Sequence, residues 1–226
     1  MVLAQPFSAN GPTPADEALM VWIQKMEEGR RADYEMYLDY YRGVHPTQLT
    51  DRLHKFLSVK SAFRFADNFC VPVVDALVER LSVTGLASES DDLANWGWQL
   101  WQENRADALQ VLVHTETILK GDSYVMAAWD GEDERLRWHY QDPALIIPHY
   151  DGETGKMLWL SKKWLADQGI GKQPLTRLNL YYPERIEKYA AQGRVWQRFG
   201  ETDMQGRAEP WPVPWVDSQG WPLGIP

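Results

Sequence analysis

The sequence contains a single cysteine, Cys70, so no internal disulfide bond can form. Its apolar neighbours Phe69 and Val71 predict that the thiol is buried as a small apolar side chain. No run of eighteen apolar residues is present, so no transmembrane helix is predicted. The first residues lack the basic start and apolar stretch of a secretory signal, and none is predicted there.

Positive charge is scarce, and the formal net charge is −9. Tight nonspecific binding to DNA depends mainly on Lys and Arg side chains that neutralise phosphates. The composition therefore argues against such a DNA binder. It is compatible with a surface past which DNA slides without sticking, because a negative field repels the phosphates.

Metal-binding motifs are incomplete. His114 and Glu116 have the spacing of the first half of a zinc-deaminase motif, but that motif also needs two cysteines. The acidic run 130–134 has alternating carboxylates, yet Arg135 and Gln141 stand where a calcium loop needs glycine and glutamate. We expect a helix-surface histidine and a solvated hairpin turn at these two places, and no metal site.

Motifs for phosphate binding and nucleophilic catalysis are also missing. Residues 169–172 read Gly-Ile-Gly-Lys, without the spacing of a phosphate-binding loop, and a flexible turn is expected there. A Gly-x-Ser-x-Gly motif is absent. We predict no catalytic residue and no cofactor, so the chain is not expected to be an enzyme. Catalytic groups that meet only in the fold remain an open alternative.

Tryptophan is abundant, with twelve residues in the chain. Its large ring and single N–H donor make it frequent at half-buried positions and in interfaces. Three interpretations stay open: a subunit interface, an aromatic face that binds a carbohydrate or peptide, and rings that only pack in the core.

Helical periodicity dominates the first half of the chain. Apolar spacing and end signals predict helices over about 13–29, 30–42, 60–81, 90–103 and 106–120. Glycines are expected to end the first, second and last of these helices, at Gly29, Gly43 and Gly121. Pro72 predicts a kink or a new helix start, and Ser90 is the expected cap of the fourth helix. The residues expected on its buried face are Leu93, Trp96, Gly97, Leu100 and Trp101.

Alternating apolar residues dominate from 122 to about 200. They predict strands over 123–129, 135–140, 144–150, 157–164, 177–182, 185–190 and 194–199. The expected fold is α+β, with helices over about 14–120 followed by an antiparallel sheet over about 122–200.

The expected organisation has three parts. Residues 1–12 are predicted to be a disordered arm, because they offer little apolar surface to bury. Residues 13–208 form the folded region, with a helical part over 13–121 and a β part over 122–208. The Pro- and Trp-rich tail 209–226 is predicted to be an extended connector.

Four segments together resemble one branch of the portal proteins of tailed bacteriophages. The first, 40–46, reads YYRGVHP and follows a Tyr-rich helix, and the second, 68–86, reads NFCVPVVDALVERLSVTGL. The third, 96–126, joins a Trp-containing helix to Gly-Asp-Ser-Tyr-Val, and the fourth, 141–151, is an Asp-Pro turn with an apolar strand ending in Tyr-Asp. They occur in the order and spacing of that family.

The resemblance implies a structural role in the virion. Portal proteins form a ring, commonly of twelve subunits, at one vertex of the capsid, and they assemble in the host cytoplasm. The implied partners are the large terminase subunit, a head-completion or adaptor protein, and the major capsid and scaffolding proteins. DNA passes through the channel without sequence-specific binding. The portal itself is not the packaging ATPase.

The family's members are about twice as long as this chain. The matching part corresponds to their outer, wing-like region, and the stem, clip and crown regions would be expected after Pro226.

The resemblance also selects candidate structural or interface residues. Tyr40, Tyr41, Arg42 and Gly43 are expected to fix the end of the second helix and its packing. Arg42 is either an exposed helix-end cation or half of an ion pair between subunits.

Asn68 and Arg80 are further candidates, for which local capping or solvation is the simpler expectation. The alternative function is an aromatic-rich binding module for a carbohydrate or peptide.

Overall fold

The chain folds into two compact units, a sheet unit and a helical unit. The computed structural model describes residues 2–6, 18–19, 21–44, 52, 55, 68–130, 133–167, 174–192, 195–200 and 208–226. The sheet unit spans residues 1–29 and 126–226, and the helical unit spans residues 30–125. The expected α+β fold, with helices before an antiparallel sheet, is confirmed.

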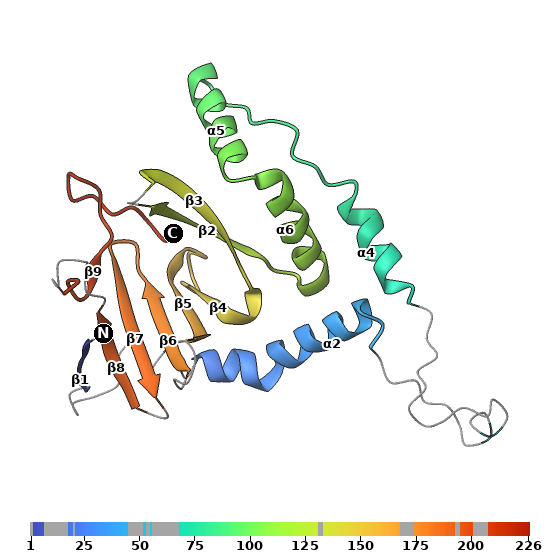
Figure 1. Ribbon diagram of the computed structural model, residues 1–226, viewed down its shortest axis with the longest axis horizontal. Coiled ribbons are helices and arrows are strands. Elements are labelled where there is room, and N and C mark those ends of the chain that lie inside the picture. Colours follow the sequence, from blue (N-terminus) through green and yellow to red (C-terminus); the bar gives the residue numbers. More distant parts are fainter. Residues whose placement is uncertain are drawn as a thin grey trace. The chain divides into compact units, whose positions relative to one another are not determined.

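The sheet unit is built on a seven-stranded antiparallel sheet with the strand order β1-β8-β7-β6-β5-β4, in which β9 also pairs with β7 (Figure 1). The strands are β1 (Val2–Pro6), β4 (Ile146–Tyr150), β5 (Met157–Ala166), β6 (Leu175–Tyr181), β7 (Arg185–Gln192), β8 (Val195–Gly200) and β9 (Val213–Pro214). A separate hairpin contains β2 (Tyr124–Asp130) and β3 (Arg135–Gln141), and a short 3-10 helix, η2 (Pro143–Leu145), precedes β4. All seven segments with alternating apolar residues are therefore strands.

Both faces of the main sheet carry buried side chains. Leu178, Leu180 and Tyr189 lie on one face in a cluster that also includes Ala18 from the N-terminal helical residues. Leu175 and Phe199 belong to a second buried cluster. Alternation along β6 places Leu175 and Leu178 on opposite faces, so the sheet is covered on both sides. This explains why its strands are rich in apolar residues.

The first twelve residues were predicted to be a disordered arm, and for Val2–Pro6 this is wrong. They form β1, which pairs with β8 through the register Val2↔Gly200 and Leu3↔Phe199. A strand needs only main-chain partners, and β8 presents an edge whose N–H and C=O groups this pairing satisfies. Residues 7–12 lie outside the described part of the chain.

The first helical residues belong with the sheet and not with the other helices. Trp22 and Met26 are buried, and the π-helix η1 (Ile23–Arg30) contains Gly29. Glycine was expected to end this helix. Its unfavourable helix propensity amounts to about 1 kcal/mol, which the burial of two large side chains exceeds.

The Pro- and Trp-rich tail packs against β7 instead of leading away from it. Lys188 forms an ion pair with Glu209 at 2.8 Å, and the Trp211 indole N–H donates to the Lys188 carbonyl at 2.9 Å. The ring of Trp211 meets Tyr189 edge-on with centroids 5.6 Å apart. The described residues 208–226 contain one strand, the two-residue β9.

The helical unit contains α2 (Arg31–Tyr41), α4 (Cys70–Val78), α5 (Asp91–Glu103) and α6 (Ala106–Lys120) (Figure 1). Helix α6 contacts each of the other three. Pro72 lies in the first turn of α4, where its missing N–H has no intrahelical partner to lose, so the predicted new start is confirmed. Gly121 ends α6 with φ 81°, as predicted. No helix of the described residues is long and apolar enough to cross a membrane.

Burial in the helical unit differs from the prediction. Of the residues expected on the buried face of α5, Leu100 is buried, whereas Leu93 and Trp96 are exposed. Cys70 is half-buried, not buried. Periodicity identifies an apolar face, whereas burial depends on whether another element covers that face.

Candidate functional site

The end of α2 forms a Schellman motif around Gly43. The Val44 N–H donates to the Asp39 carbonyl at 2.7 Å, and the Gly43 N–H donates to the Tyr40 carbonyl at 3.1 Å. Gly43 has φ 71°, a left-handed conformation that strains other residues. A Cβ added there would also lie 3.4 Å from the Asn68 side-chain nitrogen. That distance is an ordinary van der Waals contact, so glycine is required by its left-handed conformation and not by the approach of Asn68.

Asn68 links the end of α2 to the start of α4. Its Nδ2 donates to the Tyr41 carbonyl at 2.6 Å, and its Oδ1 accepts from the Cys70 N–H at 3.0 Å. The first bond satisfies a carbonyl at the end of α2, and the second satisfies an N–H at the start of α4. The two bonds need opposite ends of the amide, which fixes its orientation.

Tyr41 adds a second contact between the same helices. Its hydroxyl donates to Asp75 Oδ1 at 2.9 Å, across 34 positions of sequence. This hydrogen bond, followed by burial and the negative charge of Asp75, raises the pKa of Tyr41. Main-chain and side-chain atoms of Tyr41 thus contact α4 in two places.

A third contact joins the beginning of α2 to the residues after α6. The hydroxyl of buried Tyr34 donates to Asp122 Oδ2 at 2.8 Å, and Arg30 forms an ion pair with the same carboxylate. The guanidinium of Arg30 lies 5.4 Å from the centre of the Tyr34 ring, and the Lys120 ammonium lies 5.8 Å from it. Asp122 is thus an acceptor for a hydroxyl and a guanidinium that the helices bring together.

The structure brings only some of the candidate residues together. Tyr41, Gly43 and Asn68 meet at the α2–α4 junction, which we define as Tyr41, Gly43, Asn68 and Asp75. Tyr40 is 45% exposed, and Arg42 is an exposed helix-end residue.

Arg80 is exposed beyond the end of α4 and takes no part in the junction. Local capping was expected of Asn68, and its bond to the Cys70 N–H confirms that expectation. The bond from Asn68 to the Tyr41 carbonyl was not expected, because it connects two helices instead of capping one.

Sequence reasoning missed Asp75, Asp122 and Tyr34. Asp122 stands in the Gly-Asp-Ser-Tyr segment, and Tyr34 lies seven residues before Tyr41 on the same helix. Residues seven apart share a face of a helix, so the sequence could have predicted that Tyr34 and Tyr41 lie on the same face of α2. No local pattern marked the carboxylates as their partners.

The weak metal-binding motifs have structural explanations. Glu116 pairs with Lys120 at 2.5 Å, one helical turn away, and His114 is half-buried on the same helix. Asp133 accepts from both Arg135 and Arg137, and these hydrogen bonds lower its pKa. Within the described residues, no three His, Cys, Asp or Glu side chains cluster as metal ligands. The Gly-Ile-Gly-Lys segment 169–172 and the histidines His45 and His54 lie outside the residues that the structure describes.

Hydrogen bonds and one ion pair thus connect α2 to α4 and to the residues after α6. The Tyr41 carbonyl, the Asp75 carboxylate and the Asp122 carboxylate each accept from a residue that is distant in sequence, which is suited to a rigid scaffold. No family model matches the chain, and no curated protein sequence matches it either.

Proposed function

We propose that the chain is a structural subunit of the portal ring of a tailed bacteriophage, located at one capsid vertex of the virion. In this role it helps to form the conduit through which DNA enters and leaves. It offers docking sites for the terminase motor and head-completion proteins and contacts capsid and scaffolding proteins. The observation that carries the proposal is the series of four portal-like segments, which occur in the family's order over residues 40–151.

The positions of these segments in the fold support a structural role. Tyr41 comes from the first segment, Asn68 and Asp75 from the second, and Asp122 from the third. Asn68 bonds Tyr41, and Asp75 bonds Tyr41 as well. The portal-like segments thus supply residues that hold the helices together, as expected of a structural protein.

The fourth segment also has a structural explanation. Asp142 Oδ1 accepts from the Ala144 N–H at 2.9 Å and caps the short helix η2. Strand β4 follows immediately, with Ile146 and Ile147 buried. The Asp-Pro turn thus starts a central part of the sheet unit.

The aromatic side chains of the main sheet favour packing over ligand binding. Trp159 is half-buried, and its ring stacks on His149 with centroids 3.5 Å apart and on Tyr182 with centroids 6.0 Å apart. Trp164 lies under the cations of Lys162 and Arg177, at 4.9 and 5.2 Å from the ring centre. A stacking platform for a carbohydrate or peptide needs ring faces open to solvent, so these rings count against a binding module on the main sheet. The exposed tryptophans lie elsewhere, on α5, on the hairpin and in the tail, and do not form a row on that sheet.

Native mass spectrometry of the protein from its source, with a denatured run on the same sample, tests the proposal. The expected result is a closed ring of identical subunits whose chain mass is well above 26.1 kDa. A chain of 26.1 kDa that stays monomeric would overturn it. Negative-stain microscopy of the same sample distinguishes a ring from an open assembly.

A further inference from the structure

Helix α4 carries an exposed apolar stripe. Phe69, Val73 and Leu77 follow one another at intervals of four residues, which places them on one face of the helix. Their side chains are 73%, 64% and 49% exposed, respectively. We call these three residues the α4 stripe. Three large apolar side chains in a row are more than the single exposed residues that are normal on a monomer.

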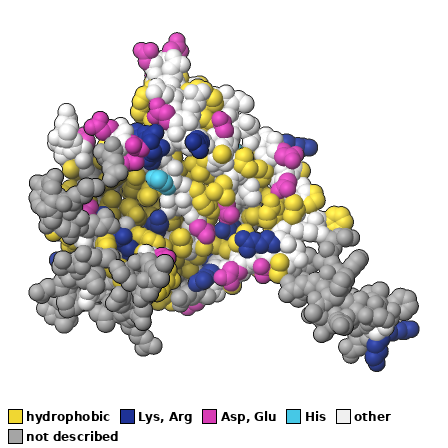
Figure 2. All heavy atoms as spheres, in the orientation of Figure 1, with side chains coloured by type: hydrophobic (Ala, Val, Ile, Leu, Met, Phe, Trp, Pro, Cys, Tyr) yellow, Lys and Arg dark blue, Asp and Glu magenta, His cyan; other side chains and the backbone are white. Residues whose placement is uncertain are grey.

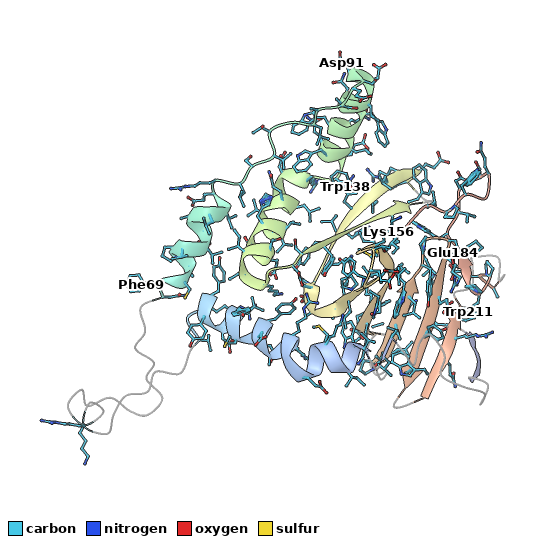
Figure 3. All side chains as sticks on the ribbon, turned by 180° about the vertical axis from the view of Figure 1, so that it is seen from behind. Phe69, Asp91, Trp138, Lys156, Glu184 and Trp211 are labelled. Atoms are coloured by element: carbon cyan, nitrogen blue, oxygen red, sulfur yellow. The ribbon has the colours of Figure 1, made fainter. Side chains whose placement is uncertain are left out.

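Helix α5 carries a second apolar surface. Leu93 and Trp96 lie one helical turn apart and are 55% and 56% exposed. We call these two residues the α5 patch. Figure 3 shows Phe69, the first residue of the α4 stripe, and Asp91, which precedes the α5 patch, at separate ends of the helical unit. The two surfaces therefore do not cover each other within one copy.

The helical unit has a small core for its size. Among its described residues, the buried apolar side chains are Tyr34, Val74, Val78, Leu100 and Ala106. The apolar atoms on the outside of α4 are visible in the space-filling view (Figure 2). Burial of apolar surface stabilises a protein by roughly 25 cal/mol per Å². The exposed area of the two surfaces gives none of this stabilisation until a partner covers it. The unit gains most from a partner that covers both surfaces.

Charges beside the two surfaces can pair. Glu79 and Arg80 are exposed just beyond the end of α4, and Asp91 and Asp92 are exposed in the first turn of α5. Within the described residues, Arg80 has no ion-pair partner. When the α4 stripe of one copy meets the α5 patch of another, Arg80 can pair with the acidic residues of α5 at the edge of the contact.

We propose that the α4 stripe of one copy of this chain packs on the α5 patch of the next copy. The interface is head-to-tail, since each copy contributes a different surface to each of its two contacts. Such contacts generate closed rings when the rotation closes, and open chains when it does not. The inference rests on the proposed function, which it deepens by naming the two surfaces through which ring subunits meet.

The test uses two variants of the full chain, each blocked at one surface. Val73→Glu places a charge in the α4 stripe, and Leu93→Glu places one in the α5 patch. Met36→Glu is the control, because Met36 is an exposed apolar residue on α2, outside both surfaces. Circular dichroism verifies that all three variants keep the helical content of the parent chain. Sedimentation velocity over a range of concentrations then measures self-association.

The expected result is that each blocked variant associates at least tenfold more weakly than the parent, as for a residue near the centre of an interface. The control is unchanged. A one-to-one mixture of the two blocked variants forms a pair and stops there, because one intact stripe still meets one intact patch. A symmetric interface would give no such rescue by mixing.

Other outcomes overturn the proposal in distinguishable ways. If the parent forms closed rings and neither blocked variant weakens them, the surfaces are wrong and the portal function stands. If Val73→Glu lowers the melting temperature of a chain that is monomeric throughout, another part of the same chain covers the stripe. If the pairing occurs as expected but the parent forms open chains, the interface stands and the ring function is wrong.

Discussion

The side-chain amide of Asn68 donates a hydrogen bond to the main-chain carbonyl of Tyr41 at 2.6 Å, across 27 positions of sequence. The same amide accepts from the Cys70 N–H. One residue therefore satisfies main-chain groups at two helix ends that have no intrahelical partners. This explains why an asparagine stands directly before α4, where its acceptor acts as a local cap and its donor reaches α2.

Replacing Asn68 by alanine is expected to lower the free energy of unfolding of the chain by about 1–3 kcal/mol, since two half-buried main-chain groups lose their partner. Urea titration followed by far-UV circular dichroism measures the change. Asn68→Asp keeps the acceptor for the Cys70 N–H but sets a carboxylate oxygen against the Tyr41 carbonyl, so its effect should be at least as large. A smaller effect would show that the bond to the Cys70 N–H outweighs the contact with Tyr41.

Gly43→Ala is expected to destabilise the chain by about 1–2 kcal/mol, because alanine is strained in the left-handed conformation that Gly43 adopts. Gly85 is a matched control in the same unit, with no left-handed φ and no atom within 4 Å of an added Cβ. Gly85→Ala should be neutral or slightly stabilising, because it reduces the freedom of the unfolded chain. Thermal denaturation of both variants distinguishes a conformational requirement from a general preference for glycine.

Local patterns predicted most of the elements. Alternating apolar residues located every strand from β2 to β8, because a side-chain period of two is itself the geometry of a strand. Glycine at Gly43 and Gly121 correctly marked helix ends, since both adopt left-handed conformations. The strand β1 escaped prediction because its pairing with β8 involves main-chain atoms that every residue possesses.

The candidate site was only partly predictable. The resemblance pointed to Tyr41, Gly43 and Asn68, which do meet. Asp75 and Asp122 were missed because a hydrogen bond between distant positions leaves no spacing in the sequence, as the 88 positions between Tyr34 and Asp122 illustrate. Burial on α5 was predicted wrongly for a related reason: a helical period reveals an apolar face but not its cover.

Asp122→Ala is expected to lower the free energy of unfolding by about 1–3 kcal/mol, because the buried Tyr34 hydroxyl loses its acceptor and Arg30 loses its counter-ion. Asp39→Ala is the control, since Asp39 is an exposed carboxylate on α2. Urea titration at two salt concentrations measures both variants, because urea adds no ionic strength. A loss at Asp122 that vanishes in high salt would mean that the surface-accessible ion pair, not the Tyr34 bond, is responsible.

His149 predicts a pH dependence of the sheet unit. Its ring stacks on Trp159, and burial, with a smaller effect of the nearby Lys25 charge, lowers its pKa to about 4. The folded state therefore favours the neutral imidazole. Its contribution to stability is fully present above the ordinary histidine pKa of about 6.5 and is lost as the pH falls toward 4. Because the side chain is only half-buried, we expect a loss of about 1–2 kcal/mol between pH 7 and pH 4.

Urea titrations monitored by tryptophan fluorescence at pH 7, 5.5 and 4 measure this dependence. His149→Gln should remove about 1–2 kcal/mol of the decrease in stability on acidification, since glutamine does not titrate in this range. His139→Gln is the matched control: His139 is exposed on β3, and its replacement should leave the decrease unchanged. If both variants lose stability on acidification as the parent does, carboxylate groups and not His149 govern the acid sensitivity of the sheet unit.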